Sequence, residues 1–268
     1  MATTTMTETP TFTMGGVASA TFGSIGRNFA TFALLALLAE VPQQALSWYT
    51  TQIGNSAQIG AAAANPAALM SLGGTILATS LLTIIMAYVL QAAIVYGTIT
   101  DLNGRRASLG SCLSTAFKVL LPLIGLSIVS TFGVVLGMVL LIVPGVILAL
   151  GWAVAVPVRV VERTGVFDSL GRSWQLTSGY KGTLFLLFLI FGLASLLFGF
   201  LGQAMAGVFS LTRPGTMPAS LPITYFIYTG VIQAVSAMVG AAGAATIYYQ
   251  LRAIKEGIAP EKLAAVFD

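Results

Sequence analysis

The stretch VLLPLIGLSIVSTFGVVLGMVLLIVPGVILALGWAVAVPV (residues 119–158) decides the fold, because it runs for 40 residues without a charged side chain. A helix crosses the hydrocarbon core of a bilayer, which is about 30 Å thick, in about 20 residues. The stretch is therefore long enough to cross twice, and the pair Pro144-Gly145 supplies a turn between the two crossings. We predict membrane spans at about 119–141 and 146–161.

The composition of the whole chain agrees with this interpretation. Of its 268 residues only 7% are charged, 57% are hydrophobic, and the mean hydropathy is +0.93. A soluble domain carries about 25% charged residues, so this inventory cannot cover a surface exposed to water. The apolar runs are continuous rather than alternating, which favours helices over a β-barrel. We predict an all-α integral membrane protein with six transmembrane helices.

The same required length of about 20 residues identifies the remaining four spans. They lie at about 29–49, 74–99, 182–205 and 223–250. The membrane domain would then cover residues 15–255. We expect residues 1–14, which are rich in Thr, to form a disordered cytoplasmic tail. Residues 256–268 would form a cytoplasmic C-terminal tail.

The basic residues predict the orientation of the helices. Of the 12 Lys and Arg residues, all but Arg213 lie beside span ends on one side of the predicted topology. Cytoplasmic loops carry the excess of Lys and Arg, so we place both termini in the cytoplasm. The net charge of +4 and the pI near 9.4 indicate attraction to anionic lipids. They do not indicate nucleic-acid binding, because no basic patch lies outside these loops.

Three similar segments precede the odd-numbered spans. They begin at Phe22, Leu109 and Leu170, and each passes from an apolar residue and Gly through a polar stretch that carries a basic residue. We interpret each as a short amphipathic helix in the membrane interface, so that the six spans form three hairpins. Chance similarity between loops of like composition is the alternative. Separately, Gly133-x-x-x-Gly137 is a close-packing motif for helices within the chain or between two copies.

Several short motifs resemble one bacterial family. The most specific is RSWQLTSG (172–179), which follows the hairpin motif VPG (143–145); others are DLNGR (101–105) and YYQLR (248–252). From about residue 15 to 255 the chain is similar to the glycerophosphoryl diester phosphodiesterase membrane domain and to YciC-like six-span inner-membrane proteins. The resemblance implies a bacterial inner-membrane module connected with lipids or the envelope, of poorly known role and without the catalytic phosphodiesterase domain.

The residue inventory argues against an enzyme. There is no histidine, and Cys112 is the single cysteine. This excludes His-based acid–base catalysis, His-ligated metal sites and an intramolecular disulfide. We therefore predict no catalytic residue, no metal site and no cofactor. The expected partners are membrane lipids, with a second copy of the chain or another membrane protein as further candidates.

A basic cluster before the fifth span is the candidate site for lipid headgroups. It consists of Arg163, Arg172, Trp174 and Lys181. Clustered cations beside an interfacial Trp suit anionic headgroups. The competing interpretation is a structural cluster of ion pairs that fixes the loop. Its members would be Glu162, Arg163, Asp168 and Arg172.

Glu40 is the one ionisable residue well inside a predicted span, and it is the candidate for an ion or solute site. A charge at this depth costs about 2.5–3.5 kcal/mol, so the side chain should face water or the interior of the bundle. If the first span began near Gly26 instead, Glu40 would lie in the outer third, close to the headgroups. A small-solute transporter or channel is the alternative function. Its cavity would be lined by Glu40, Gln43, Gln91, Gln203 and Gln233.

Overall fold

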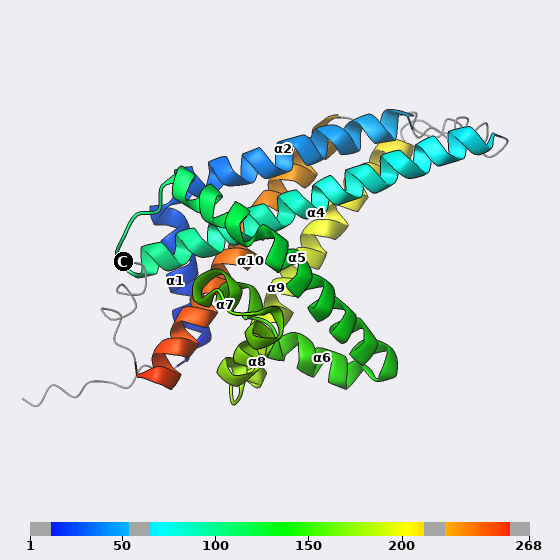
Figure 1. Ribbon diagram of the computed structural model, residues 1–268. Coiled ribbons are helices and arrows are strands. Elements are labelled where there is room, and N and C mark those ends of the chain that lie inside the picture. The colour runs from blue at the N-terminus through cyan, green and yellow to red at the C-terminus, as the bar shows by residue number, and fades with distance from the viewer. Residues whose placement is uncertain (1–11, 54–64, 212–222, 258–268) are drawn as a thin grey trace, which may run out of the picture.

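The computed structural model of the protein describes residues 12–53, 65–211 and 223–257. Within these ranges every regular element is a helix (Figure 1). The helices are α1 (Met14–Arg27), α2 (Phe29–Ile53), α4 (Pro66–Leu102), α5 (Leu109–Leu140), α6 (Ile142–Gly151), α7 (Ala155–Glu162), α8 (Val166–Thr177), α9 (Lys181–Leu211) and α10 (Ile223–Glu256). Most of both predicted tails, and the segment that holds Arg213, lie outside the described residues.

Six stretches of helix are long and apolar enough to cross a membrane, which confirms the all-α class and the expected number of spans. They are Phe29–Tyr49, Gly73–Leu102, Leu109–Leu140, Ile142–Glu162, Lys181–Gly202 and Ile223–Glu256. The chain is therefore a multi-pass membrane protein. The first span has the predicted bounds, whereas α10 continues past the predicted end at residue 250 to Glu256.

The fourth span is not one continuous helix, in contrast to the prediction. Helix α6 ends at Gly151 and α7 begins at Ala155, with a turn between them. Pro157 explains the break, because a proline inside a helix has no N–H to donate and clashes with the carbonyl four residues earlier. In the first turn of α7 the same proline is tolerated. The break frees the carbonyl of Gly151 for partners outside its own helix.

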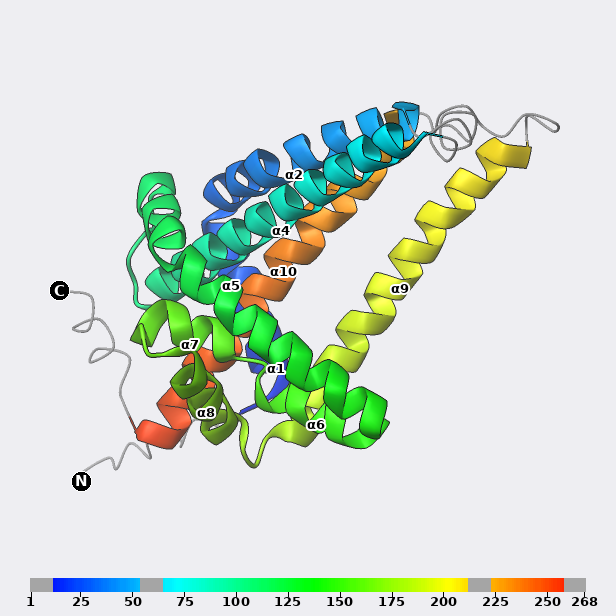
Figure 2. The same ribbon diagram turned by 45° about the vertical axis from the view of Figure 1, so that its right-hand side comes forward.

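Two of the three segments predicted as interfacial helices overlap short separate helices: Phe22 lies in the second half of α1, and Leu170 lies inside α8. The segment at Leu109 does not. Ser108 caps α5, which begins at Leu109 and continues without interruption to Leu140. Pro122 lies inside α5, and Figure 2 shows that the first turns run in a different direction from the rest. Because sharp bends commonly arise at proline, this segment is the arm of a bent helix.

The spans pack around α4 and α10. Helices α2, α4 and α10 lie side by side, and α5 packs against α4 and α6 (Figures 1 and 2). Small side chains permit these close contacts, and Ala92, Ala93, Ala242 and Ala245 are fully buried. Helix α9 is the least buried span. It meets α10 through long side chains, such as Tyr228, whose hydroxyl donates to the carbonyl of Phe198 at 2.9 Å.

The motif Gly133-x-x-x-Gly137 serves packing within the chain. A Cβ atom on Gly133 would lie 2.6 Å from the ring of Trp152, and one on Gly137 would lie 3.0 Å from the Cα atom of Gly145. Real Cβ contacts are longer, so this part of α5 approaches α6 at distances that only glycine permits. Of the two predicted uses of the motif, the structure shows the one inside a single chain.

Candidate functional site: a basic end and an apolar groove

At one end of the helix bundle the C-terminal ends of α4 and α10 lie near α1, α7 and α8 (Figure 2). The residues of these elements and of the adjoining turns are rich in Lys and Arg. We call this the basic end. It carries Arg27, Arg105, Arg106, Arg163, Arg172, Lys181, Arg252 and Lys255. Lys255, for example, donates to the carbonyl of Ser178 at 2.8 Å. The described residues at the opposite end, where α2 ends and α10 begins, include no Lys or Arg.

Asp101 joins α1 and α4 at the basic end. Its carboxylate accepts hydrogen bonds from Arg27, with an Nη2···Oδ2 distance of 2.6 Å, and from the side-chain amide of Asn28 at 2.8 Å. The Asp101 side chain is only 6% exposed, and a buried carboxylate needs such donors. The hydrogen bond to Asp101 in turn raises the pKa of Arg27 above its ordinary value, so the guanidinium stays charged.

A second network joins α7, α8 and α10. Arg172 on α8 donates through Nε to Glu162 of α7 at 3.2 Å, and through Nη2 to Glu256 at the end of α10. Arg252 donates to the other oxygen of Glu256 at 2.9 Å, and the hydroxyl of Tyr248 donates to Glu162 at 2.8 Å. Both carboxylates thus have two donor side chains, and the network fixes three helices relative to one another.

Helix α8 is held against the break in the fourth span. The hydroxyls of Ser173 and Thr177 both donate to the carbonyl of Gly151, at 2.9 and 3.1 Å. The N–H of Val154 donates to Ser173 Oγ at 3.2 Å. Gly151 also lies so close to Trp174 that a Cβ atom there would be 2.1 Å from the ring. The motif RSWQLTSG therefore has a structural explanation, since its hydroxyls satisfy backbone groups that the break leaves unpaired.

The four predicted headgroup residues have different surroundings. Arg172 is bound by Glu162, as the structural interpretation expected, and by Glu256 rather than Asp168. Arg163 is exposed at the end of α7, where it adopts a left-handed φ of 52°. The ammonium of Lys181 lies 3.2 Å from the centre of the Trp174 ring, which is a cation–π contact. Of the three cations, only Arg163 and Lys181 are thus without a carboxylate partner among the described residues.

A polar pocket of about 240 Å³ lies at the turn between α4 and α5. It is lined by Tyr96, Thr100, Asn103, Arg105, Arg106, Ser108 and Ser111. Both polar atoms of the Asn103 side chain are buried without a hydrogen-bond partner, which is costly for a buried amide. Guanidinium and hydroxyl groups are donors that suit phosphate oxygens. The sequence predicted Arg105 and Arg106 to lie beside a span end and an interfacial helix to begin at Leu109, but it did not predict this pocket.

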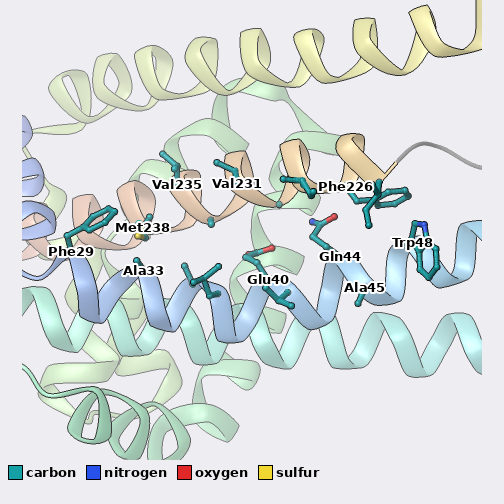
Figure 3. A pocket seen from close by; sticks show the side chains of 17 residues that line it. Phe29, Ala33, Glu40, Gln44, Ala45, Trp48, Phe226, Val231, Val235 and Met238 are labelled. Atoms are coloured by element: carbon teal, nitrogen blue, oxygen red, sulfur yellow. The ribbon is translucent and has the colours of Figure 1, made fainter. Parts of the chain in front are cut away.

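An open groove of about 560 Å³ lies between α2 and α10 (Figure 3). Its rim consists of exposed apolar side chains, among them Phe29, Trp48, Ile227 and Val231. Every lining residue except Glu40 and Gln44 is apolar or glycine. Because both helices are candidate membrane spans, the groove lies in the part of the protein that crosses the bilayer.

Glu40 lies on the floor of this groove and is only 8% exposed. Figure 3 shows its carboxyl group between the two helices. Its Oε2 atom is buried and has no hydrogen-bond partner in the described part of the chain. Glu40 stands near the middle of the span Phe29–Tyr49. The alternative span that begins near Gly26 is not what the structure shows, since Gly26 belongs to α1 and α2 begins at Phe29.

The glutamines expected to share a transport cavity with Glu40 do not gather in this groove. Gln43 lines a different cavity, between α2 and α4. Gln91 and Gln233 line neither of these two cavities. The side chain of Gln203 lies outside the described part of the chain.

Gln44 is a second polar residue of the groove, which the sequence did not predict. Its Oε1 accepts a hydrogen bond from the hydroxyl of Thr229 on α10 at 3.3 Å. The signal was present in the spacing, because residues four apart lie on one face of a helix. Glu40 and Gln44 have this spacing, whereas Gln43 points to another side of α2.

These features define a multi-pass helical membrane protein with a polar, basic end and one carboxyl group in an apolar groove. No family model, no curated protein and no solved structure matches the chain. The ranges that the structure describes contain no group of three or more His, Cys, Asp or Glu placed to hold a metal ion.

Proposed function

We propose that the chain is a non-enzymatic protein of the bacterial inner membrane that engages anionic lipids with its basic end. The supporting observation is the concentration of Lys and Arg at that end, against none among the described residues of the opposite end. Juxtamembrane cations attract anionic lipids by about 1 kcal/mol each. They also favour the cytoplasmic side, so both termini are placed in the cytoplasm.

In this proposal α1, the first turns of α5, and α8 lie in the cytoplasmic interface, each ahead of a helical hairpin. The resemblance to the glycerophosphoryl diester phosphodiesterase membrane domain belongs to the same proposal and agrees with a role in lipid or envelope organisation. A second copy of the chain or another envelope protein is a further proposed partner.

We assign the contacts to headgroups to cations that form no ion pair with a described carboxylate. Lys181 lies over the Trp174 ring, Arg163 is exposed at the end of α7, and Arg106 lines the polar pocket. Arg172 is assigned a positioning role, since it holds α8 in place through Glu162 and Glu256.

The test is lipid preference of the full chain in nanodiscs of phosphatidylcholine that contain a trace of spin-labelled phosphatidylglycerol. We expect the double variant Arg106→Gln/Arg163→Gln to weaken the preference for the labelled lipid by about 1 kcal/mol per removed arginine. Gln175→Ala is the control, because it changes an exposed polar side chain at the same end without removing a cation. Equal loss in the control, or no preference in the unmodified protein, would contradict the proposal.

The alternative function is a small-solute transporter or channel. Its supporting feature is Glu40, because ionisable residues inside spans commonly mark ligand or ion sites. The scattered positions of Gln43, Gln91 and Gln233 favour the lipid-engaging protein over a polar pathway.

A further inference from the structure

We propose that the groove between α2 and α10 binds a lipophilic amine, an amphiphile with one protonated amine on an apolar body, and that Glu40 is its counter-ion. The site differs from the basic end in position and in the charge of its ligand. The inference therefore goes beyond the proposed function and can be tested apart from it.

The first argument is charge. Asp101, Glu162 and Glu256 all accept hydrogen bonds from arginine, whereas Oε2 of Glu40 has no partner. Among the described residues, no Lys or Arg lines the groove. An unpaired carboxylate in apolar surroundings costs several kcal/mol. A ligand that brings a positive charge to Glu40 removes this cost.

The second argument is shape and lining. The groove volume of about 560 Å³ falls in the range of about 300–1,000 Å³ that small-molecule sites occupy. Its apolar walls suit an apolar body, and its open side faces the bilayer, so an amphiphile can enter laterally. Gln44 adds a second polar group one turn from Glu40, within reach of the same headgroup.

Other membrane components fit the groove less well. A neutral acyl chain would fill the apolar volume but would leave Glu40 without a partner. An anionic lipid would place its phosphate near a carboxylate, where like charges repel. The amine is the ligand class that matches both the apolar walls and the acidic floor.

Trp48 gives a direct readout, because it lines the groove and the chain has only two other tryptophans. The probes are 11-bromoundecylamine and the uncharged 11-bromoundecanol, whose bromine quenches tryptophan emission. Both are added to the full chain in phosphatidylcholine nanodiscs, and the quenching in a Trp48→Phe variant is subtracted. We expect the amine to quench Trp48 at about tenfold lower concentration than the alcohol does, because only the amine can form a charge-assisted hydrogen bond with Glu40.

Three variants complete the experiment. Glu40→Gln should lower the affinity for the amine about tenfold, to that of the alcohol, while the unchanged alcohol response reports an intact groove. Asp168→Asn makes the same chemical change on α8, outside the groove, and should alter neither probe. Ala33→Phe partly fills the groove and should weaken both probes. Equal quenching by amine and alcohol, full amine affinity in Glu40→Gln, or no quenching of Trp48 by either probe would overturn the proposal.

Discussion

Carboxyl groups have opposite surroundings at the basic end and in the groove. At the basic end Asp101 and Glu162 accept hydrogen bonds from arginine side chains. In the groove Glu40 lies among apolar side chains with a buried oxygen that has no partner. Asp101 and Glu162 connect helices at the basic end, so their role is structural. Oε2 of Glu40 joins no other described residue, and the proposed amine ligand would supply its missing partner.

The largest expected effect comes from a substitution that disrupts the docking of α8 at the basic end. Gly151→Ala would place a Cβ atom 2.1 Å from the Trp174 ring, so α8 must move and lose its hydrogen bonds to the fourth span. We expect the free energy of unfolding to fall by about 3 kcal/mol, measured by unfolding in mixed micelles. Gly171→Ala, where the added atom meets nothing within 4 Å, is the control and should be neutral or stabilising. Equal stability of the two variants would contradict the docking.

The second prediction separates positioning from lipid contact among the predicted headgroup residues. Arg172→Met removes the shared donor to Glu162 and Glu256 and should lower the free energy of unfolding by about 2 kcal/mol, because two partly buried carboxylates lose a partner. Arg163→Met should leave stability unchanged and reduce only the preference for anionic lipid. If Arg163→Met destabilised the protein as much as Arg172→Met, the assigned roles would be wrong.

The third prediction compares one acid of each region. Asp101→Asn weakens the hydrogen bonds to Arg27 and should cost about 1 kcal/mol, a modest value because Arg27 is itself largely exposed. Glu40→Gln breaks no hydrogen bond to Oε2 among the described residues and removes an unpaired carboxyl group from apolar surroundings, so it should not lower the free energy of unfolding and should raise it where the carboxylate is charged. Thermal unfolding in ligand-free nanodiscs checks both. A loss of stability in Glu40→Gln would show that its carboxyl is structural.

The smallest expected effect concerns the cation–π contact at the start of α9. Lys181→Met removes the ammonium above Trp174 and should cost about 0.5 kcal/mol. Lys118→Met, at an exposed position on α5, is the control. The same unfolding assay measures both, and a difference below its error would mean that the contact contributes nothing to stability.

The sequence predicted the spans because length and apolar composition alone decide whether a helix can cross a bilayer. It failed where one residue changes the path of the backbone. The break at Gly151 depends on Pro157, yet Pro122 only bends α5. Both prolines lie in apolar runs, but only at the break do side chains of another helix, Ser173 and Thr177 of α8, donate to the freed carbonyl. Such tertiary partners are not visible in local sequence.

The candidate sites were predicted only in part for a similar reason. Glu40 stood out because it is the single acid inside an apolar run. The residues around it could not be identified, because the groove wall on α10 is almost 200 positions away in the chain. Arg172 was selected by charge, but its partner Glu256 was assigned to the tail. Composition finds charged residues, whereas their pairing depends on how the ends of α7, α8 and α10 meet.

The topology of the basic end is tested most directly by labelling cysteines in intact bacterial cells with a membrane-impermeant maleimide. In a Cys112→Ala background, Arg106→Cys marks the basic end and Ala67→Cys marks the opposite end; both native side chains are exposed. We predict that Ala67→Cys is labelled in intact cells and that Arg106→Cys reacts only after the cells are permeabilised. Labelling of Arg106→Cys from outside, or of both positions from the same side, would contradict a six-span protein with a cytoplasmic basic end.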